Sequence, residues 1–367
     1  MTDLKARAPV AAGAVFLAAL GLRVLFIALP APTYDLESWQ GVISALREGH
    51  GLYGGTHYNY SPLWALVLVG IDSLSRILRV PFPLLIRLVL LGVDIGITAL
   101  VRELALRRGR DSSRASLLAV LFFANPVSVI ASSHLYAFDN VSIAFLLLAL
   151  LAMAHPEPRK GSAAGWLSLS LLAKHVTWFH PLLFARRNRD GKRSWPVALV
   201  PYAVFAASFV PFWTQWAGIR AHVFGYRGLD EVYGTEPLRF VPWLPGESTT
   251  ILFGVAGLVA VFFLSRVEIG RACLLLFLVV LIFTPGICAY YFAWPIALGA
   301  LFPSIGFAVY TLVITGFFLK SPDVLALDWP HLPGWWGCFW ATVFWLLWEI
   351  RSRSGARESR TAVALRG

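Results

Sequence analysis

Apolar runs separated by short polar segments extend along the whole chain. Most approach the ~20 residues that an α-helix needs to cross a bilayer, and the pattern predicts a bundle of membrane helices. Several runs are shorter, and proline or glycine lies between or within them, which predicts broken or re-entrant helices. No internal repeat is evident. The runs centre on residues 11–29, 62–79, 84–105, 115–131, 140–154, 162–184, 195–213, 250–265, 271–284, 293–303, 304–319 and 335–350.

The composition agrees with this pattern, because 58% of the 367 residues are hydrophobic, 14% are charged and the mean hydropathy is +0.69. A soluble protein of this length could not bury so much apolar surface. We predict an all-α, polytopic membrane bundle of roughly 10–12 transmembrane helices. Residues 1–350 form its single domain, and residues 351–367 form a basic cytoplasmic tail. Cys273, Cys288 and Cys338 lack metal-like spacing and are interpreted as core residues.

Basic residues cluster between the apolar runs, as in "RRGRDSSR", "RRNRDGKR" and the tail "RSRSGARESR". Such clusters are typical of cytoplasmic loops, so the net charge of +11 indicates anionic membrane lipids as partners and not nucleic acid. Lys5 and Arg7 precede an apolar stretch, Val10 to Leu29, that is long for a signal-peptide core. We expect a retained first helix that enters a bacterial-type plasma membrane from the cytoplasm.

Three segments lack the basic bias and are the predicted outer loops: residues 30–60, 214–249 and 320–334. Basic segments bracket the single run 162–184, and two runs separate the first outer loop from the basic loop at 107–114. If every run crossed the membrane, these basic segments could not all lie in the cytoplasm. One element in each region must therefore enter the membrane without crossing it, or one basic segment must face outward.

The first outer loop contains "PTYDLESWQ", with Asp35 and Glu37, and continues to "YNYSPLW", with Tyr60. Pro62 is expected in the first turn of the next helix, where its missing N–H costs nothing. The two acids could simply remain in water on the outer face. Alternatively, carboxylates at i and i+2 could act on one sugar, one accepting a proton and the other binding a hydroxyl or a cation.

The stretch "NPVSVIASSHLYAFDN" places His134, Tyr136 and Asp139 between two apolar runs. An acid flanked by spans is costly unless it faces a cavity or the membrane interface, which makes these residues candidates for a site. Asp139 could instead cap a helix that starts at Val141.

Within "LLAKHVTWFHPLLF", Lys174 and His175 lie inside an apolar run. A buried cation requires an anion, and a lipid-linked phosphate would serve. The alternative is a structural ion pair with an intramembrane acid such as Asp94.

The late stretch "TPGICAYYFAW" ends a helix and supplies Tyr290, Tyr291 and Trp294. Aromatic belts are common at membrane boundaries, and aromatic faces also bind sugars and isoprenoid chains.

Taken in order, these motifs resemble the GT-C superfamily of membrane glycosyltransferases, in particular the polyprenyl-phosphate-sugar-dependent mannosyltransferases of the PIG-V and PIG-M type and their bacterial relatives. "YDLE" is similar to the acidic motif of the first outer loop, and "YNYSPLW" to the aromatic-proline step that follows it. "NPVSVIASSHLYAFDN", "KHVTWFHPLL" and "PGICAYYFAW" match the later motifs in part. The chain departs from the family where Leu135, Tyr136 and Ala137 replace Trp-Gly-Gln, and where Ala289 replaces a frequent Gln.

The resemblance implies transfer of a sugar, with mannose as the family expectation, from a polyprenyl-phosphate donor to a lipid or glycan hydroxyl on the extracytoplasmic face, with inversion. In this reaction Asp35 would be the base. Glu37 would be its catalytic partner, or would orient the sugar or acceptor as Asp139 would. Lys174 and His175 would bind the donor phosphate. His134, Tyr136, Tyr60, Tyr290, Tyr291 and Trp294 would join Asp139 in binding sugar or acceptor.

No cofactor is required, although a divalent metal between Asp35 and Glu37 remains open. The alternative functions are a transporter or flippase for a lipid-linked sugar, which would place polar groups at mid-membrane depth, and a non-catalytic lipid-binding protein.

Overall fold

The structure is a computed structural model that describes residues 2–30, 33–185, 194–225, 246–284, 286–320, 324 and 334–364. Across these ranges the backbone forms sixteen α-helices and four short 3₁₀ or π segments, with no strand. The prediction of an all-α chain is therefore confirmed. Each predicted apolar run falls on one of these helices or on a helix interrupted by a break.

The elements follow one another with these bounds: α1 Thr2–Ala28, α2 Tyr34–Arg47, α3 Pro62–Leu78, α4 Phe82–Arg107, α5 Ser112–Phe123, α6 Pro126–Ser133, α7 Asp139–Met153, α8 Lys160–Ala173, η1 His175–Thr177, α9 His180–Phe184, α10 Trp195–Ala207, η2 Val210–Gln215, α11 Trp216–Gly218, η3 Ile219–Phe224, α12 Gly246–Leu264, α13 Ile269–Phe283, η4 Ala289–Ala293, α14 Ile296–Leu301, α15 Ile305–Lys320 and α16 Trp335–Ala364.

Proline and its neighbours set the helix starts where the sequence predicts them. The Asn125 side chain accepts a hydrogen bond from the Val127 N–H at 3.0 Å and so caps α6. Pro126 follows, and α5 and α6 meet at a bend of 50°. In the same way Ser61 caps α3 and Pro62 begins it.

Two of the described helices are long and apolar enough to cross a membrane alone, namely Val10–Ala28 within α1 and Phe82–Arg107, which is α4. Up to four spans result if the bent pair α5–α6 and the bent pair of α10 with η2–η3 each count as one crossing. The other apolar helices have 10–17 residues. By length and composition, the described part of the chain thus has two to four candidate spans, which suits a multi-pass membrane protein.

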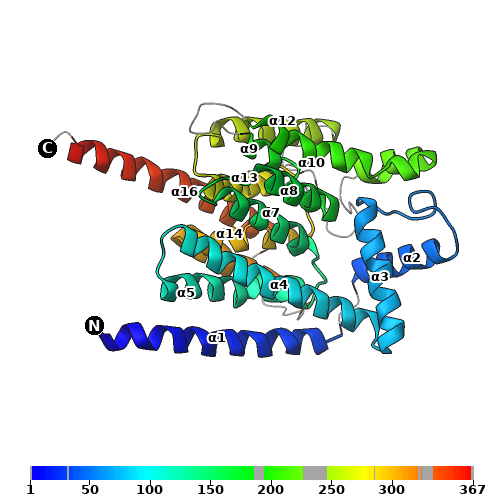
Figure 1. The fold of residues 1–367 in the computed structure, drawn as a ribbon, viewed down its shortest axis with the longest axis horizontal. Coiled ribbons are helices and arrows are strands. Elements are labelled where there is room, and N and C mark those ends of the chain that lie inside the picture. The colour runs from blue at the N-terminus through cyan, green and yellow to red at the C-terminus, as the bar shows by residue number, and fades with distance from the viewer. Residues whose placement is uncertain are drawn as a thin grey trace.

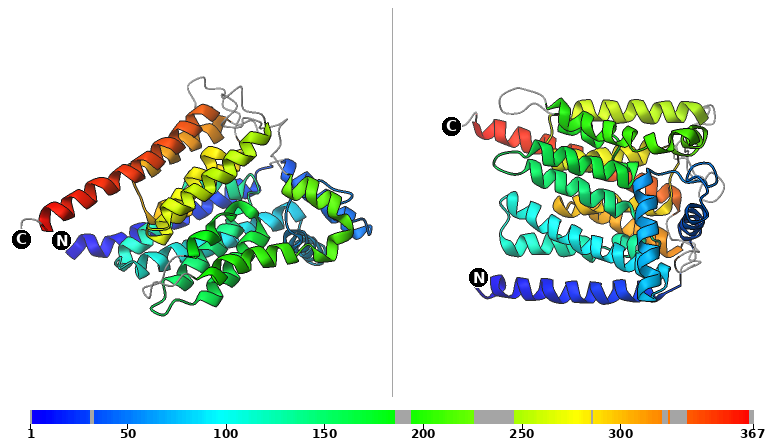
Figure 2. Two further views of the ribbon diagram at one scale, coloured as in Figure 1. Left: turned by 90° about the horizontal axis from the view of Figure 1, so that it is seen from above. Right: turned by 45° about the vertical axis from the view of Figure 1, so that its right-hand side comes forward.

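Both chain ends lie at one end of the bundle, and α2 and α3 lie at the other (Figure 1). α3 runs steeply across the axes of α1 and α4 in two views (Figure 1, Figure 2), so the run 62–79 crosses the end of the bundle instead of following its length. This orientation is compatible with the first of the two alternatives above, an element that does not cross. The run 162–184 is broken at Lys174, where the backbone is extended.

A buried ion pair between Arg23 of α1 and Asp94 of α4 holds the middle of the bundle together. The Arg23 guanidinium also donates to the Phe123 carbonyl at 3.0 Å and to the Ser128 hydroxyl at 2.9 Å. Asp94 in turn accepts a hydrogen bond from Asn140 Nδ2 at 2.6 Å. The suggestion that Lys174 pairs with Asp94 is therefore wrong, because Asp94 is already paired with Arg23.

We expect Asp94→Asn to lower the free energy of unfolding by about 3–5 kcal/mol, because Arg23 would remain buried without its counter-charge. Thermal unfolding in detergent measures the change. Asp72→Asn is the matched control: Asp72 of α3 pairs with Arg47 near the surface, and its loss should cost no more than about 1 kcal/mol. Equal destabilisation by the two variants would contradict a central role for the Arg23–Asp94 pair.

Some predicted segments lie outside the described residues, namely the basic segment "RRNRDGKR" and most of the outer loops 214–249 and 320–334. The α16 backbone continues to Ala364, so the predicted tail 351–367 begins inside a helix. The three cysteines are buried and form no disulfide, as expected for core residues.

Candidate functional site

The α7–α8 hairpin brings two opposite charges together. α7 has 15 residues, α8 has 14, and a short connection joins them. Because antiparallel helices of nearly equal length end level with each other, the first residue of α7, Asp139, meets the residue after α8, Lys174. The carboxylate lies at the positive end of one helix dipole and the ammonium at the negative end of the other, which is favourable for both.

Lys174 and Asp139 form a buried ion pair, with 2.9 Å between Nζ and Oδ1 and side chains that are 2% and 1% exposed. Cation–π contacts add to this pairing, since an ammonium is attracted to the faces of aromatic rings. Four ring centroids lie 4.5–5.3 Å from Lys174 Nζ, those of Phe138, Tyr290, Tyr291 and Tyr60.

Asp139 is fixed by Trp294, whose indole Nε1–H donates to Asp139 Oδ1 at 2.7 Å. Trp294 also stacks on Tyr291, with 4.4 Å between the ring centroids. The idea that Asp139 only caps a helix is wrong: it is the first residue of α7, Phe138 occupies the cap position, and no side chain caps this helix.

Hydroxyl groups hold the break that presents Lys174. The Ser142 hydroxyl donates to the Ser170 carbonyl at 2.8 Å and lies 3.0 Å from the Lys174 carbonyl. The Ser170 hydroxyl bonds the Ser142 carbonyl and the Thr177 hydroxyl, each at 2.8 Å. These bonds link α7 to the end of α8 and to the turn that follows Lys174.

Asp35 reaches the same region from α2. Trp39, one helical turn later on the same face, is 1% exposed and packs against Trp64 and Phe138 with centroid separations of 5.6 and 5.5 Å. This contact turns the Asp35 face inward, and the Asp35 carboxylate interacts electrostatically with Lys174 and Asp139. We refer to Asp35, Asp139 and Lys174 together as the charged cluster.

Burial of its carboxyl group raises the pKa of Asp35 from 3.8 to about 6, although Lys174 and a hydrogen bond from the Tyr290 hydroxyl act in the opposite direction. α2 is not among the candidate membrane spans. A carboxyl group with this pKa can change its protonation state near neutral pH, as a general base requires.

Glu37 does not share this environment. The stretch "YDLE" forms the first turn of α2, and residues i and i+2 of a helix do not face each other. Glu37 is accordingly exposed, so the structure gives no support to the idea that Asp35 and Glu37 act on one ligand or hold one metal. The described residues contain no group of three or more His, Cys, Asp or Glu side chains arranged to hold a metal ion.

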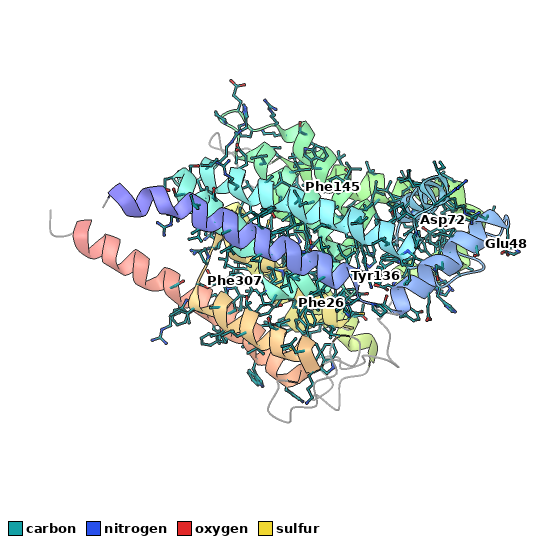
Figure 3. The ribbon with its side chains drawn as sticks, turned by 90° about the horizontal axis from the view of Figure 1, so that it is seen from below. Phe26, Glu48, Asp72, Tyr136, Phe145 and Phe307 are labelled. Carbon is teal, nitrogen blue, oxygen red and sulfur yellow. The ribbon has the colours of Figure 1, made fainter. Side chains whose placement is uncertain are left out.

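His134 and Tyr136 are not part of the charged cluster. Tyr136 has φ = 57° in the turn between α6 and α7, and its ring lies 4.2 Å from the Arg87 guanidinium and edge-on to Trp39, with 6.3 Å between the ring centroids. The ring of His134 lies edge-on to Phe26 at 5.6 Å. Both residues therefore pack near the end of α1, where Figure 3 labels Phe26 and Tyr136.

An apolar pocket of about 320 Å³ lies beside the charged cluster, although none of the three charged residues lines it. It shares His175, Tyr291 and Trp294 with the surroundings of Lys174 and Asp139. Apolar pockets with a few polar groups at one end are typical of small-molecule sites. The remaining lining residues are Val176, Trp178, Phe179, Phe205, Val223, Phe224, Thr250, Phe253, Val280, Thr284 and Gly286.

Several buried polar atoms beside the pocket have no hydrogen-bond partner among the described residues. They are Asp35 Oδ2, Asp139 Oδ2 and His175 Nδ1. Buried polar groups in proteins are nearly always paired, so three unpaired atoms this close together are unusual. Carboxylate oxygens accept hydrogen bonds, which makes hydroxyl groups suitable partners.

The structure thus brings together eight of the predicted site residues: Asp35, Tyr60, Asp139, Lys174, His175, Tyr290, Tyr291 and Trp294. It leaves Glu37, His134 and Tyr136 outside the cluster. Sequence reasoning missed Phe138, Trp39 and Ser142. Phe138 could have been chosen from the sequence, since it directly precedes Asp139. Nothing in the sequence marks Trp39 or Ser142, because tryptophan and serine residues within helices usually serve packing.

Comparison with known proteins adds no identification, because no family model, curated protein or solved structure matches the chain.

Proposed function

We propose that this protein is a GT-C-type membrane glycosyltransferase that moves a sugar from a polyprenyl-phosphate donor to a lipid or glycan hydroxyl. The observation that carries the proposal is the position of the charged cluster beside the apolar pocket. A polyprenyl-phosphate sugar has the matching order of parts: a hydroxyl-rich head, one phosphate and a hydrocarbon chain. Mannose is the proposed sugar by family resemblance alone.

The proposed topology is a multi-pass bundle of roughly 10–12 membrane segments, counting short and re-entrant ones, with the active site on the extracytoplasmic face. Two observations support this orientation. The charged cluster lies at the end of the α7–α8 hairpin opposite its connection, which ends at Arg159, and Lys160 follows as the first residue of α8. Basic connections are typical of the cytoplasmic side.

In the proposed reaction, the Asp35 carboxylate takes the proton of the acceptor hydroxyl, and the acceptor oxygen attacks the anomeric carbon. The bond from that carbon to the phosphate oxygen breaks, its electron pair stays on the phosphate, and the anomeric configuration inverts. Lys174 and His175 bind the departing phosphate, and the Lys174 ammonium stabilises its negative charge. Asp139 accepts a hydrogen bond from a sugar hydroxyl.

A transfer assay tests the proposal directly. The purified protein is incubated with a panel of radiolabelled polyprenyl-phosphate sugars and a membrane lipid extract, and labelled products are separated by chromatography. We expect one donor to give a labelled lipid or glycan. Donor binding without transfer would support the non-catalytic alternative, and translocation of intact donor across proteoliposomes would support the transporter.

The pocket volume predicts how much of the donor chain contributes to binding. At about 30 Å³ per water-sized group, 320 Å³ holds roughly ten carbons, or about two isoprene units. A ten-carbon prenyl phosphate should therefore bind about as tightly as a long polyprenyl phosphate. A five-carbon analogue should bind about a thousandfold more weakly, since each of the five missing carbons contributes about 0.8 kcal/mol, or about 4 kcal/mol in all. Titration in detergent measures both; affinity that rises steadily beyond ten carbons would contradict the assignment.

The rate should also follow the ionisation of Asp35. The base must be deprotonated, and its pKa is raised to about 6 by burial. Below pH 6 we expect the transfer rate at low substrate to fall about tenfold per pH unit, and above about pH 7 it should be constant. A rate that is flat from pH 5 to 8 would show that Asp35 does not act as the base.

A further inference from the structure

We infer that Asp139 competes with the donor phosphate for Lys174, so that donor binding transfers the ammonium from the carboxylate to the phosphate. This inference rests on the proposed function. It concerns the regulation of the same site and assigns Asp139 a role before the reaction begins.

The Lys174 ammonium has hydrogen-bonding capacity that Asp139 does not use. Lys174 Nζ lies 2.9 Å from Asp139 Oδ1, yet it makes no directed hydrogen bond among the described residues. An ammonium has three N–H donors, and here they face one carboxylate oxygen and four aromatic rings. The ion pair holds the charge in place but leaves hydrogen-bonding capacity for a second anion.

Negative charge exceeds positive charge in the charged cluster. With Asp35 and Asp139 ionised, the charged cluster has two carboxylates for one ammonium. A phosphate that enters this cluster brings further negative charge close to Asp139, and like charges a few ångströms apart repel strongly where water is excluded. The phosphate therefore binds best when Lys174 turns from Asp139 toward it.

Asp139 can bind the sugar once Lys174 has turned to the phosphate. Its Oδ1 keeps the hydrogen bond from Trp294 Nε1, so the carboxylate stays in place. Its Oδ2 has no partner among the described residues and can accept a hydrogen bond from a hydroxyl of the sugar. The exchange would thus couple recognition of the phosphate to recognition of the sugar.

Asp139→Asn tests the inference, because the amide oxygen still accepts from Trp294 while the charge is removed. We expect this variant to bind a ten-carbon prenyl phosphate about tenfold more tightly than the wild type, measured by titration in detergent. Asp72→Asn, which removes a carboxylate outside the site, should leave the affinity unchanged. The double variant Asp139→Asn/Lys174→Met should bind prenyl phosphate no more tightly than Lys174→Met alone, because Asp139 affects the affinity only through the Lys174 ammonium.

The outcomes separate the inference from the proposed function. If the wild type binds prenyl phosphate and Asp139→Asn binds it equally or more weakly, the exchange is refuted while the proposed function stands. If the wild type does not bind prenyl phosphate at all, both are refuted. A gain that persists in the double variant would also overturn the inference, since Lys174 would not be the group for which Asp139 competes. Thermal unfolding of each variant shows that it is folded.

Discussion

Asp35→Asn is expected to reduce sugar transfer about 10³-fold while leaving the fold intact and the affinity for prenyl phosphate no weaker than that of the wild type. The amide has the same shape as the carboxylate but cannot take the proton of the acceptor hydroxyl, and a positioned general base contributes about 10²–10⁴-fold to a rate. Trp39, which anchors α2, is not altered by the change. Initial rates with the labelled donor, together with a titration of prenyl phosphate, measure both quantities.

Glu37→Gln is the matched control for this experiment, because it removes an acid from the same helical turn on an exposed position. We expect a rate within about twofold of the wild type, as is usual for surface substitutions. Near-normal turnover of Asp35→Asn would remove Asp35 as the base. A large loss in Glu37→Gln would show that the exposed acid takes part after all.

Lys174→Met should have the second large effect, on both stability and binding. Asp139 would remain buried with no cation beside it, and breaking a buried pair from one side costs about 3–5 kcal/mol. Binding of prenyl phosphate should fall at least about a hundredfold, because the only ammonium of the charged cluster is lost. Thermal unfolding and titration measure the two effects separately.

A second substitution separates these effects. Adding Asp139→Asn removes the unpaired carboxylate, so the double variant should regain most of the stability but not the affinity. Lys160→Met, at an exposed position at the start of α8, is the control and should change neither quantity. Unchanged affinity in Lys174→Met would contradict the phosphate role, and unchanged stability would contradict the ion pair.

Much of the fold could be predicted because it depends on local features. Apolar runs of sufficient length mark the helices, and the breaks at Asn125 and Lys174 coincide with polar residues inside apolar runs. The meeting of Asp139 and Lys174 follows from two adjacent helices of nearly equal length. Trp294, which directly follows η4, donates a hydrogen bond to Asp139. This contact joins segments far apart in the sequence, and only the family resemblance led us to expect it.

The rest depends on geometry that a linear pattern does not contain. Secondary structure decides whether Asp35 and Glu37 can act on one ligand. In an extended segment the two side chains would lie on the same face, but in the helix α2 they do not. Tyr136 has a left-handed backbone, and its ring packs on the Arg87 guanidinium. Which acid pairs with Lys174 was equally open, because Asp94 and Asp139 both lie in or beside apolar runs; Arg23 decides it by taking Asp94.

The position of a bound donor analogue is the most direct test of the central claim, that the charged cluster and the apolar pocket form one donor site. A cryo-electron microscopy structure with a non-transferable prenyl-phosphate sugar analogue provides this measurement. We predict the phosphate within hydrogen-bonding distance of Lys174 Nζ and His175, the sugar beside Asp35 and Asp139, and the chain between Trp178 and Phe253. A phosphate bound at the opposite end of the bundle, or a chain outside the pocket, would contradict the claim.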